Sequence, residues 1–117
     1  MTNKTGVLAG AQRDISVTTK GYVGRSEVEL ARGKLLHVIS RVPNLPAVVE
    51  CTLTRSGNPS VSEPAMAHAS IELNGELVVG HAEGMTMSAA VHLLAHRLDQ
   101  QILGNLDRKV ARRHPPT

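Results

Sequence analysis

Residues 72–102 read ELNGELVVGHAEGMTMSAAVHLLAHRLDQQI, and this stretch decides the fold because its hydrophobic period changes once along its length. Asn74-Gly75 is a strong signal for a two-residue hairpin turn. Residues 76–83 alternate apolar and polar side chains, as a half-buried strand does. Thr86 is expected to cap a helix whose apolar residues recur at helical spacing: Met87, Val91, Leu94, Leu98 and Ile102. The stretch therefore predicts a hairpin followed by an amphipathic helix.

Strand-like alternation and helical spacing of apolar residues also occur in the N-terminal part of the sequence. Alternation of side chains predicts strands at 14–21, 47–55 and 65–73, and the second of these segments is also rich in β-branched residues. A helix is predicted between the first two strands, with Ser26 as N-cap and Glu29 completing a capping box. Its apolar stripe is Val28, Ala31, Leu35, Val38, Ile39 and Val42. Gly33 lies in the middle of this helix, where it either allows a close approach or is simply tolerated.

The predicted order β-α-β-β-β-α indicates an α+β fold with a layout like that of a double-stranded RNA-binding domain. Each helix has a single apolar stripe, so both helices must pack on one face of the four-stranded sheet. We expect the other face to be polar and acidic and to lie in water; its expected members are Glu50, Thr52, His68, Ser70 and Glu72. The predicted domain is 13–107, between a flexible tail (1–12) and a basic tail or linker start (108–117). Gly104-Asn105 is expected to stop or kink the second helix, and the residues beyond it are expected either to continue as a helix or to fray.

Composition narrows the functional classes. Tyr22 is the only aromatic residue in the 117-residue chain. Binding of single-stranded nucleic acid by stacking its bases on aromatic side chains is therefore nearly excluded. Cys51 is the only cysteine, which rules out an intramolecular disulfide and predicts an inert core thiol. The sequence has no apolar run of about 20 residues and no apolar signal-peptide segment at its start. We expect a cytoplasmic protein without a membrane partner.

Charge is distributed unevenly along the chain. Residues 1–41 hold seven Lys/Arg and three Asp/Glu, a net charge of +4. Residues 42–107 hold two basic and seven acidic residues, a net charge of −5, and residues 108–117 hold four basic residues and no acidic one. Such segregation can orient a domain on a polyanion, although a mixed, solvated surface with a basic tail remains an equal alternative at this stage.

His92 and His96 lie four residues apart in the second predicted helix, so their imidazoles share one face. That face points away from the apolar stripe, and a metal site there would need a third ligand from outside the helix. His81 and Glu83 are the nearest candidates in sequence, and position 93 is Leu, so the HExxH motif is absent. We therefore expect an exposed, partly protonated pair that holds no metal, and we expect no cofactor and no enzymatic activity.

The whole-domain pattern resembles the ribosome hibernation-promoting factor family, also described as ribosome-associated inhibitors. The resemblance covers roughly residues 14–105. Its most specific part is 72–102, where the family's helix begins Met-aromatic-Ala-Ala-Ile and this chain reads MSAAV at 87–91. The family's Lys-Leu-x-x-Gln-Leu continuation corresponds here to RLDQQI at 97–102. Residues 31–39 match the first-helix pattern more loosely. Ser88 and Gln100 depart from the family's usual aromatic and basic residues.

The resemblance implies a small non-enzymatic domain that binds the small ribosomal subunit and the 70S ribosome. In that family the domain occupies the channel used by mRNA and tRNA anticodon ends, blocks translation and preserves idle bacterial ribosomes under stress. Long members add a C-terminal dimerisation domain, which we expect to be absent from this chain, whether it is excised from a longer protein or stands alone. The expected 16S rRNA-binding residues are Lys20, Arg25, Lys34, His37, Arg41, His92, His96, Arg97, Arg108, Lys109, Arg112 and Arg113.

Three other functions remain open from the residues alone. A generic double-stranded RNA-binding module would have a related layout and would bind isolated duplexes. A metal-dependent enzyme would use His92 and His96. A dimerisation module would use a second apolar stripe formed by Leu103, Leu106 and Val110.

Overall fold

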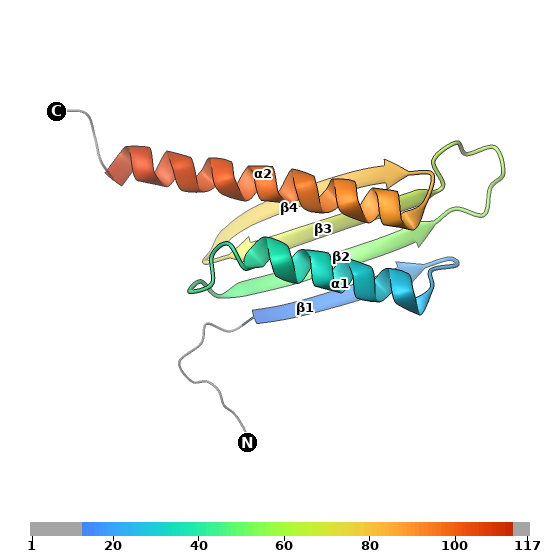
Figure 1. The fold of residues 1–117 in the computed structure, drawn as a ribbon, viewed down its shortest axis with the longest axis horizontal. Helices are drawn as coiled ribbons and strands as arrows, with labels where there is room; N and C mark the ends of the chain where they lie inside the picture. Colours follow the sequence, from blue (N-terminus) through green and yellow to red (C-terminus); the bar gives the residue numbers. More distant parts are fainter. Residues whose placement is uncertain (1–12, 114–117) are drawn as a thin grey trace, which may run out of the picture.

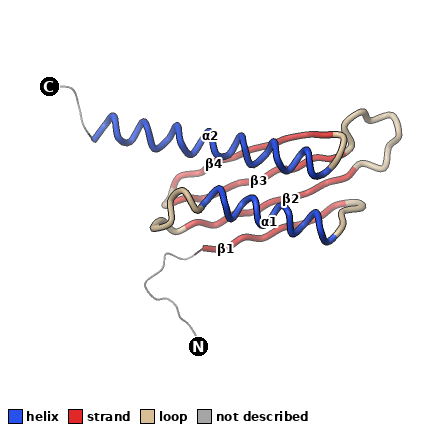
Figure 2. The backbone as a smooth tube through the Cα atoms, in the orientation of Figure 1, coloured by secondary structure: helices blue, strands red, loops and turns tan. Residues whose placement is uncertain are grey.

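The computed structural model describes residues 13–104 with their side chains and residues 105–113 as helical backbone. The elements follow the order β-α-β-β-β-α (Figures 1 and 2). They are β1 (Arg13–Lys20), α1 (Arg25–Ile39), β2 (Ala47–Arg55), β3 (Ala65–Leu73), β4 (Glu76–Gly84) and α2 (Met87–Arg113). The predicted α+β fold is confirmed.

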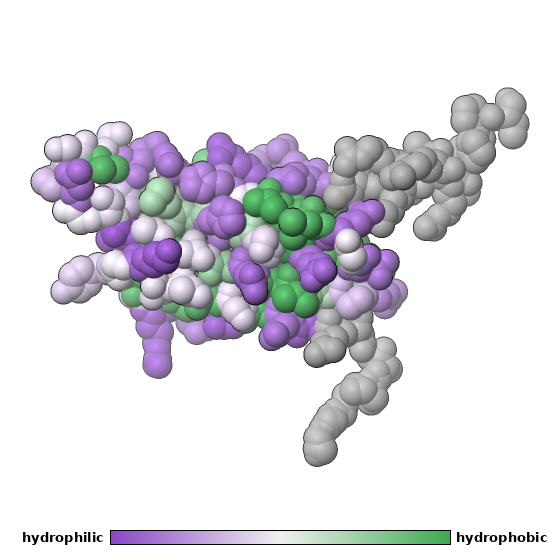
Figure 3. Space-filling model, turned by 180° about the vertical axis from the view of Figure 1, so that it is seen from behind, coloured by the Kyte–Doolittle hydropathy of each residue, from purple (hydrophilic) through white to green (hydrophobic). Residues whose placement is uncertain are grey.

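The four strands form one mixed sheet in the order β1-β2-β3-β4. β1 pairs parallel with β2, and α1 is the crossover between them, while the other two pairs are antiparallel. The turn between β3 and β4 is the predicted Asn74-Gly75 turn, with positive φ at both residues (52° and 86°). Both helices lie on the same face of the sheet (Figure 1). Figure 3 shows the molecule from the opposite side, which no helix covers.

The core lies between the helices and the sheet and is built almost entirely from aliphatic side chains. The largest fully buried side chains include Leu35, Ile39, Leu53, Ile71 and Leu98. Cys51 is buried among them, as predicted, and burial raises the pKa of its thiol to about 11. The thiol is therefore protonated at neutral pH and is neither a nucleophile nor a metal ligand.

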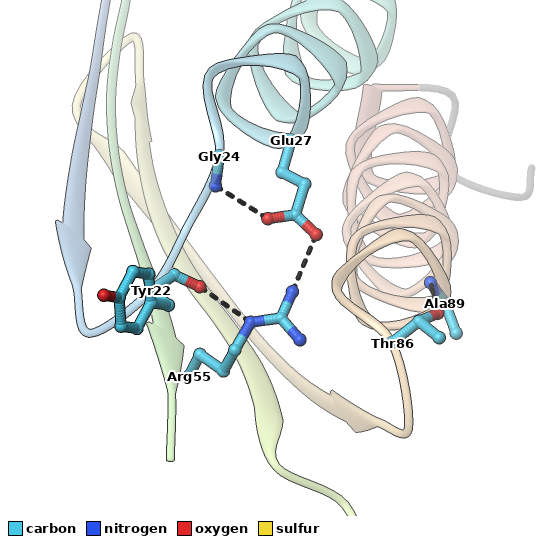
Figure 4. Close-up of polar contacts among 6 residues, drawn as sticks. All are labelled: Tyr22, Gly24, Glu27, Arg55, Thr86 and Ala89. Carbon is cyan, nitrogen blue, oxygen red and sulfur yellow. Dashed lines mark hydrogen bonds and ion pairs between the residues drawn. The ribbon is translucent and has the colours of Figure 1, made fainter. Parts of the chain in front are cut away.

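The start of α1 differs from the prediction. The N-cap is Gly24, not Ser26, and Glu27, not Glu29, occupies the third helical position. The Glu27 carboxylate accepts a hydrogen bond from the Gly24 N–H at 2.8 Å. It also forms an ion pair with the Arg55 guanidinium at 2.7 Å. Arg55 is the last residue of β2, so an ion pair between the end of a strand and the first turn of α1 favours this earlier helix start. Thr86 caps α2 as predicted, because its hydroxyl accepts a hydrogen bond from the Ala89 N–H at 3.1 Å (Figure 4).

At the end of α2 the structure decides between the two alternatives, because the helix continues through Gly104-Asn105 to Arg113. A single glycine costs a helix only about 1 kcal/mol, which is too little to end it by itself. The basic residues of 108–113 therefore belong to the helix backbone rather than to an irregular tail.

Long side chains from both helices cover the two edges of the sheet. Arg32 of α1 donates a hydrogen bond to the Ile15 carbonyl on β1 at 3.0 Å. Arg97 and Gln101 of α2 donate to the His81 and Val79 carbonyls on β4, both at 2.6 Å. These contacts occupy backbone acceptors that would otherwise be open to a strand of another chain.

Two glycines predict opposite effects on stability. A Cβ at Gly80 on β4 would lie 2.8 Å from Leu98 Cδ2 and 3.1 Å from Leu94 Cδ1, both of them buried residues. A Cβ at Gly33 would meet no atom within 4 Å. We expect Gly80→Ala to lower the free energy of unfolding by about 1–3 kcal/mol and Gly33→Ala to raise it by up to about 1 kcal/mol. Chemical denaturation measures both; a neutral Gly80→Ala would contradict the close packing of α2 on β4.

Cys51 predicts a stability loss in alkaline solution. The thiol has a higher pKa when folded (about 11) than its ordinary value of 9.0, so ionisation favours the unfolded chain. The stability that comes from keeping the thiol protonated is fully present below pH 9 and is lost as the pH rises to about 11. The wild type should lose unfolding free energy between pH 9 and pH 11, while Cys51→Ala lacks the thiol and should not lose this contribution. We therefore expect the variant to become more stable relative to the wild type as the pH rises. A difference that does not vary with pH from 8 to 11 would contradict the burial of the thiol.

Candidate nucleic-acid interface

Lys34, His37 and Arg41 share one side of α1 and the turn that follows it, as their spacing predicts. Arg41 reaches from that side to α2, where its guanidinium donates to the two Asp99 carboxylate oxygens at 2.7 and 3.1 Å. This side of α1 therefore faces the seam between the helices. The hydrogen bond with Asp99, and secondly its charge, raises the already high pKa of Arg41. The ion pair offsets much of the charge that Arg41 would offer to a polyanion.

A shallow open hollow of about 450 Å³ lies along this side of α1. Its described lining residues are Glu29, Leu30, Gly33, Lys34 and His37. Since Gly33 has no side chain and nothing packs against its position, the hollow is open above the helix backbone. Lys34 and His37 border the hollow, so an anion seated in it would meet two nitrogen-bearing side chains.

His92 and His96 are both exposed on α2, as predicted. Their spacing relative to Asp99 places them toward the same seam between the helices. His81 and Glu83 are not near them: both residues lie on the face of β4 opposite the helices, where their side chains contact each other at 3.4 Å. The sequence-based choice of these two as possible third ligands was therefore wrong. Within residues 13–104, no group of three or more His, Cys, Asp or Glu side chains could hold a metal ion.

The remaining predicted basic residues occupy three different environments. Arg25 is exposed at the first turn of α1. Arg97 is exposed but donates to the edge of β4, so it has a structural role as well. Lys20 lies in register with Thr54 and so points to the face without helices, away from Lys34. The side chains of four other predicted residues lie outside the described part: Arg108, Lys109, Arg112 and Arg113.

The loop between β1 and α1 carries an exposed tyrosine and is held in place by contacts with Arg55. Tyr22, the only aromatic residue, is 91% exposed. Its carbonyl accepts a hydrogen bond from Arg55 at 2.7 Å, and the same guanidinium pairs with Glu27 (Figure 4). Gly21 is required beside it, because φ is +81° and a Cβ would lie 2.3 Å from the Arg55 carbonyl oxygen. The loop is thus fixed although its largest side chain is almost fully exposed.

The two sides of the described domain differ in charge. The helix side and the edges it covers carry mostly arginine and lysine: Arg25, Arg32, Lys34, Arg41 and Arg97, against Glu27, Glu29 and Asp99. The strand positions that face away from the helices carry Asp14, Glu50, Glu72 and Glu83, against Lys20. A polyanion would therefore be attracted to the helix side and repelled by the sheet side.

Among the described residues, neither helix is long and apolar enough to cross a lipid bilayer.

Solved structures share this architecture over most of their length. A ribosomal subunit interface protein from Coxiella burnetii aligns with a TM-score of 0.67 and 20% identity, over 80% of this chain and 98% of that one. The N-terminal domain of Protein Y from Thermus thermophilus aligns with a TM-score of 0.63 and 20% identity, over 76% of this chain and 94% of that one. No protein-family model and no curated protein matches the sequence. The resemblance predicted from residues 72–102 is thus confirmed as a structural match, and the chain has the fold of these two proteins.

Proposed function

We propose that this chain is a ribosome-associated domain that binds the small ribosomal subunit with its helix side. The observation that carries the proposal is the structural match over nearly the whole of a ribosomal subunit interface protein. The charge difference between the two sides supports it, because rRNA attracts basic side chains through its phosphates. The carboxylates of the open sheet face would be turned away from the RNA.

Binding rests on phosphate contacts and shape rather than on base edges. Folded RNA is recognised mainly through its backbone, and neutralising phosphates releases counterions, so the affinity falls as salt rises. Lys34, His37 and Arg25 are the strongest described candidates, because within residues 13–104 none of these side chains is engaged in an ion pair. The exposed imidazoles of His92 and His96 could donate hydrogen bonds to phosphate oxygens there. Arg41 contributes less because Asp99 holds it.

The effect on translation would be steric. A folded domain in the mRNA and tRNA channel prevents both from binding, without any chemical step. Such a protein acts in the bacterial cytoplasm and preserves ribosomes that are idle under stress. The helical residues Arg108, Lys109, Arg112 and Arg113 extend the same helix and would add phosphate contacts beyond the described side chains.

Co-sedimentation with purified 30S subunits and 70S ribosomes at low and moderate salt tests the proposal. We expect the wild type to be retained, and an Arg25→Gln, Lys34→Gln variant to bind about tenfold more weakly with a shallower salt dependence. The matched control is Thr18→Glu, Thr54→Glu, which changes the net charge by the same amount on the open sheet face. It should bind nearly as the wild type does.

Three results would contradict this proposal. If the wild type were not retained even at low salt, the ribosome assignment would fail. If it bound isolated RNA duplexes as tightly as 30S subunits, the chain would instead be a generic duplex-binding module. Equal losses in both variants would place the RNA elsewhere than on the helices.

Asp99→Asn gives a second prediction, in the opposite direction. The substitution releases Arg41 and removes a negative charge from the helix side. We expect tighter binding to 30S subunits. The affinity should also fall more steeply with salt, by the amount that about one additional phosphate contact gives. The unfolding free energy should change little, because the ion pair lies at the surface, where solvent screens it. Weaker binding by a folded Asp99→Asn variant would show that the Arg41–Asp99 pair itself forms part of the interface.

A further inference from the structure

The open face of the sheet carries a regular arrangement of side chains that the proposed function does not use. The strand register aligns Asp14, Val48, Glu72 and Leu77 in one row across β1 to β4. The next row on this face is Ser16, Glu50, Ser70 and Val79. Carboxylates and aliphatic side chains therefore alternate across the first row, and the second row adds one carboxylate and one valine, at the end of the sheet nearest the Asn74-Gly75 turn.

The aliphatic side chains of these rows are exposed to an unusual degree. Val48 is 44% exposed, Leu77 is 68% exposed and Val79 is 42% exposed. Figure 3 shows hydrophobic side chains gathered on this side of the molecule. Substituting a polar residue at any of the three positions would leave the core intact, so the fold does not require them to be apolar. Grouped apolar side chains on a polar face are typical of a binding surface.

The surface is hollowed where these side chains meet. One depression of about 260 Å³ is lined by Val48, Glu50, Ser70, Glu72 and Leu77. A second of about 250 Å³ adjoins it and is lined by Pro46, Val48, Glu72, Asn74 and Gly75. Val48 and Glu72 line both depressions, so each one combines an aliphatic side chain with a carboxylate.

We propose that this hollowed patch, formed by Val48, Glu50, Glu72, Leu77 and Val79, binds a basic peptide segment that carries an aliphatic anchor. The anchor would bury against Val48 and Leu77, and flanking Lys or Arg side chains would pair with Glu50, Glu72 and Asp14. Charge complementarity selects this partner: within residues 13–104, the open face offers one lysine, Lys20, in the row farthest from the patch. Opposite charges at the rim fix the partner and its register, while the apolar contact supplies the burial.

The same charges exclude the other occupants. A nucleic acid would bring its phosphates against three carboxylates. A second copy of the domain docked face to face would oppose the acidic rows of both copies, which costs several kcal/mol for like charges held together. Pairing through the sheet edges is hindered by Arg32, Arg97 and Gln101, which already bind edge carbonyls. The face of the sheet, not its edge, is therefore the free surface.

The test uses the purified chain alone, so its result does not depend on ribosome binding. The probe is a synthetic peptide of about ten residues with two leucines flanked by arginines; the control probes replace the leucines by serine or the arginines by glutamate. Binding is followed by calorimetry and by backbone amide NMR shifts. We expect the first peptide to shift amides around Val48, Glu72 and Leu77, and both control peptides to bind at least tenfold more weakly.

Protein variants locate the site. Leu77→Ser and Glu72→Lys should each weaken the peptide at least fivefold. Matched substitutions on the helix side, Leu36→Ser and Glu29→Lys, should leave binding unchanged, since Leu36 is also an exposed leucine (55%) and Glu29 an exposed glutamate. The proposal is overturned if the peptide does not bind at millimolar concentration, or if Leu77→Ser and Glu72→Lys bind it as the wild type does. A concentration-dependent dimer that Leu77→Ser abolishes, without peptide binding, would also overturn it and identify a second copy as the occupant.

Discussion

The packing of α1 and α2 against one face of the sheet determines which side chains this domain can offer to a partner. Each helix buries a single aliphatic stripe, and α2 lies so close to β4 that a Cβ at position 80 would force buried leucine side chains to shift. Because both helices use the same face, the second face of the sheet remains open. The alternation of each strand then separates its side chains between a buried core and that open surface. The difference in charge between the two sides follows from this one constraint.

Local sequence patterns were sufficient to predict the elements of the fold. The Asn74-Gly75 turn, the Thr86 cap and the period of the α2 stripe depend on neighbouring residues, and all three are present. The start of α1 could not be predicted in the same way. Ser26 and Glu29 form an acceptable capping box, but the choice of Gly24 depends on Arg55, which lies 28 residues beyond Glu27. Whether the second helix stops at Gly104-Asn105 or continues beyond it was left open by the local pattern. It continues, because one glycine is a weak signal against a continuing helix.

The candidate site was less predictable than the fold, because the environment of a charge depends on distant residues. Helical periodicity placed Lys34, His37 and Arg41 on one side, but it could not reveal that Asp99, 58 residues away, holds Arg41. It could not show that Arg97 is bound to the edge of β4 or that Lys20 points to the other face. The exposed patch was missed for a related reason. Val48 and Leu77 are unremarkable within their own strands and meet only when the strand order and register are known.

Directed hydroxyl-radical probing tests most directly which side of this domain meets RNA. Cys51 is buried and weakly ionised, so a single cysteine introduced at a partly exposed surface position can carry the iron probe selectively. Probes at Lys34→Cys, on the helix side, and at Ser70→Cys, on the open sheet face, would be compared on 30S subunits. The account predicts strong 16S rRNA cleavage from position 34 and little or none from position 70. Cleavage that is stronger from position 70 would contradict the assignment of the helix side as the RNA-binding surface.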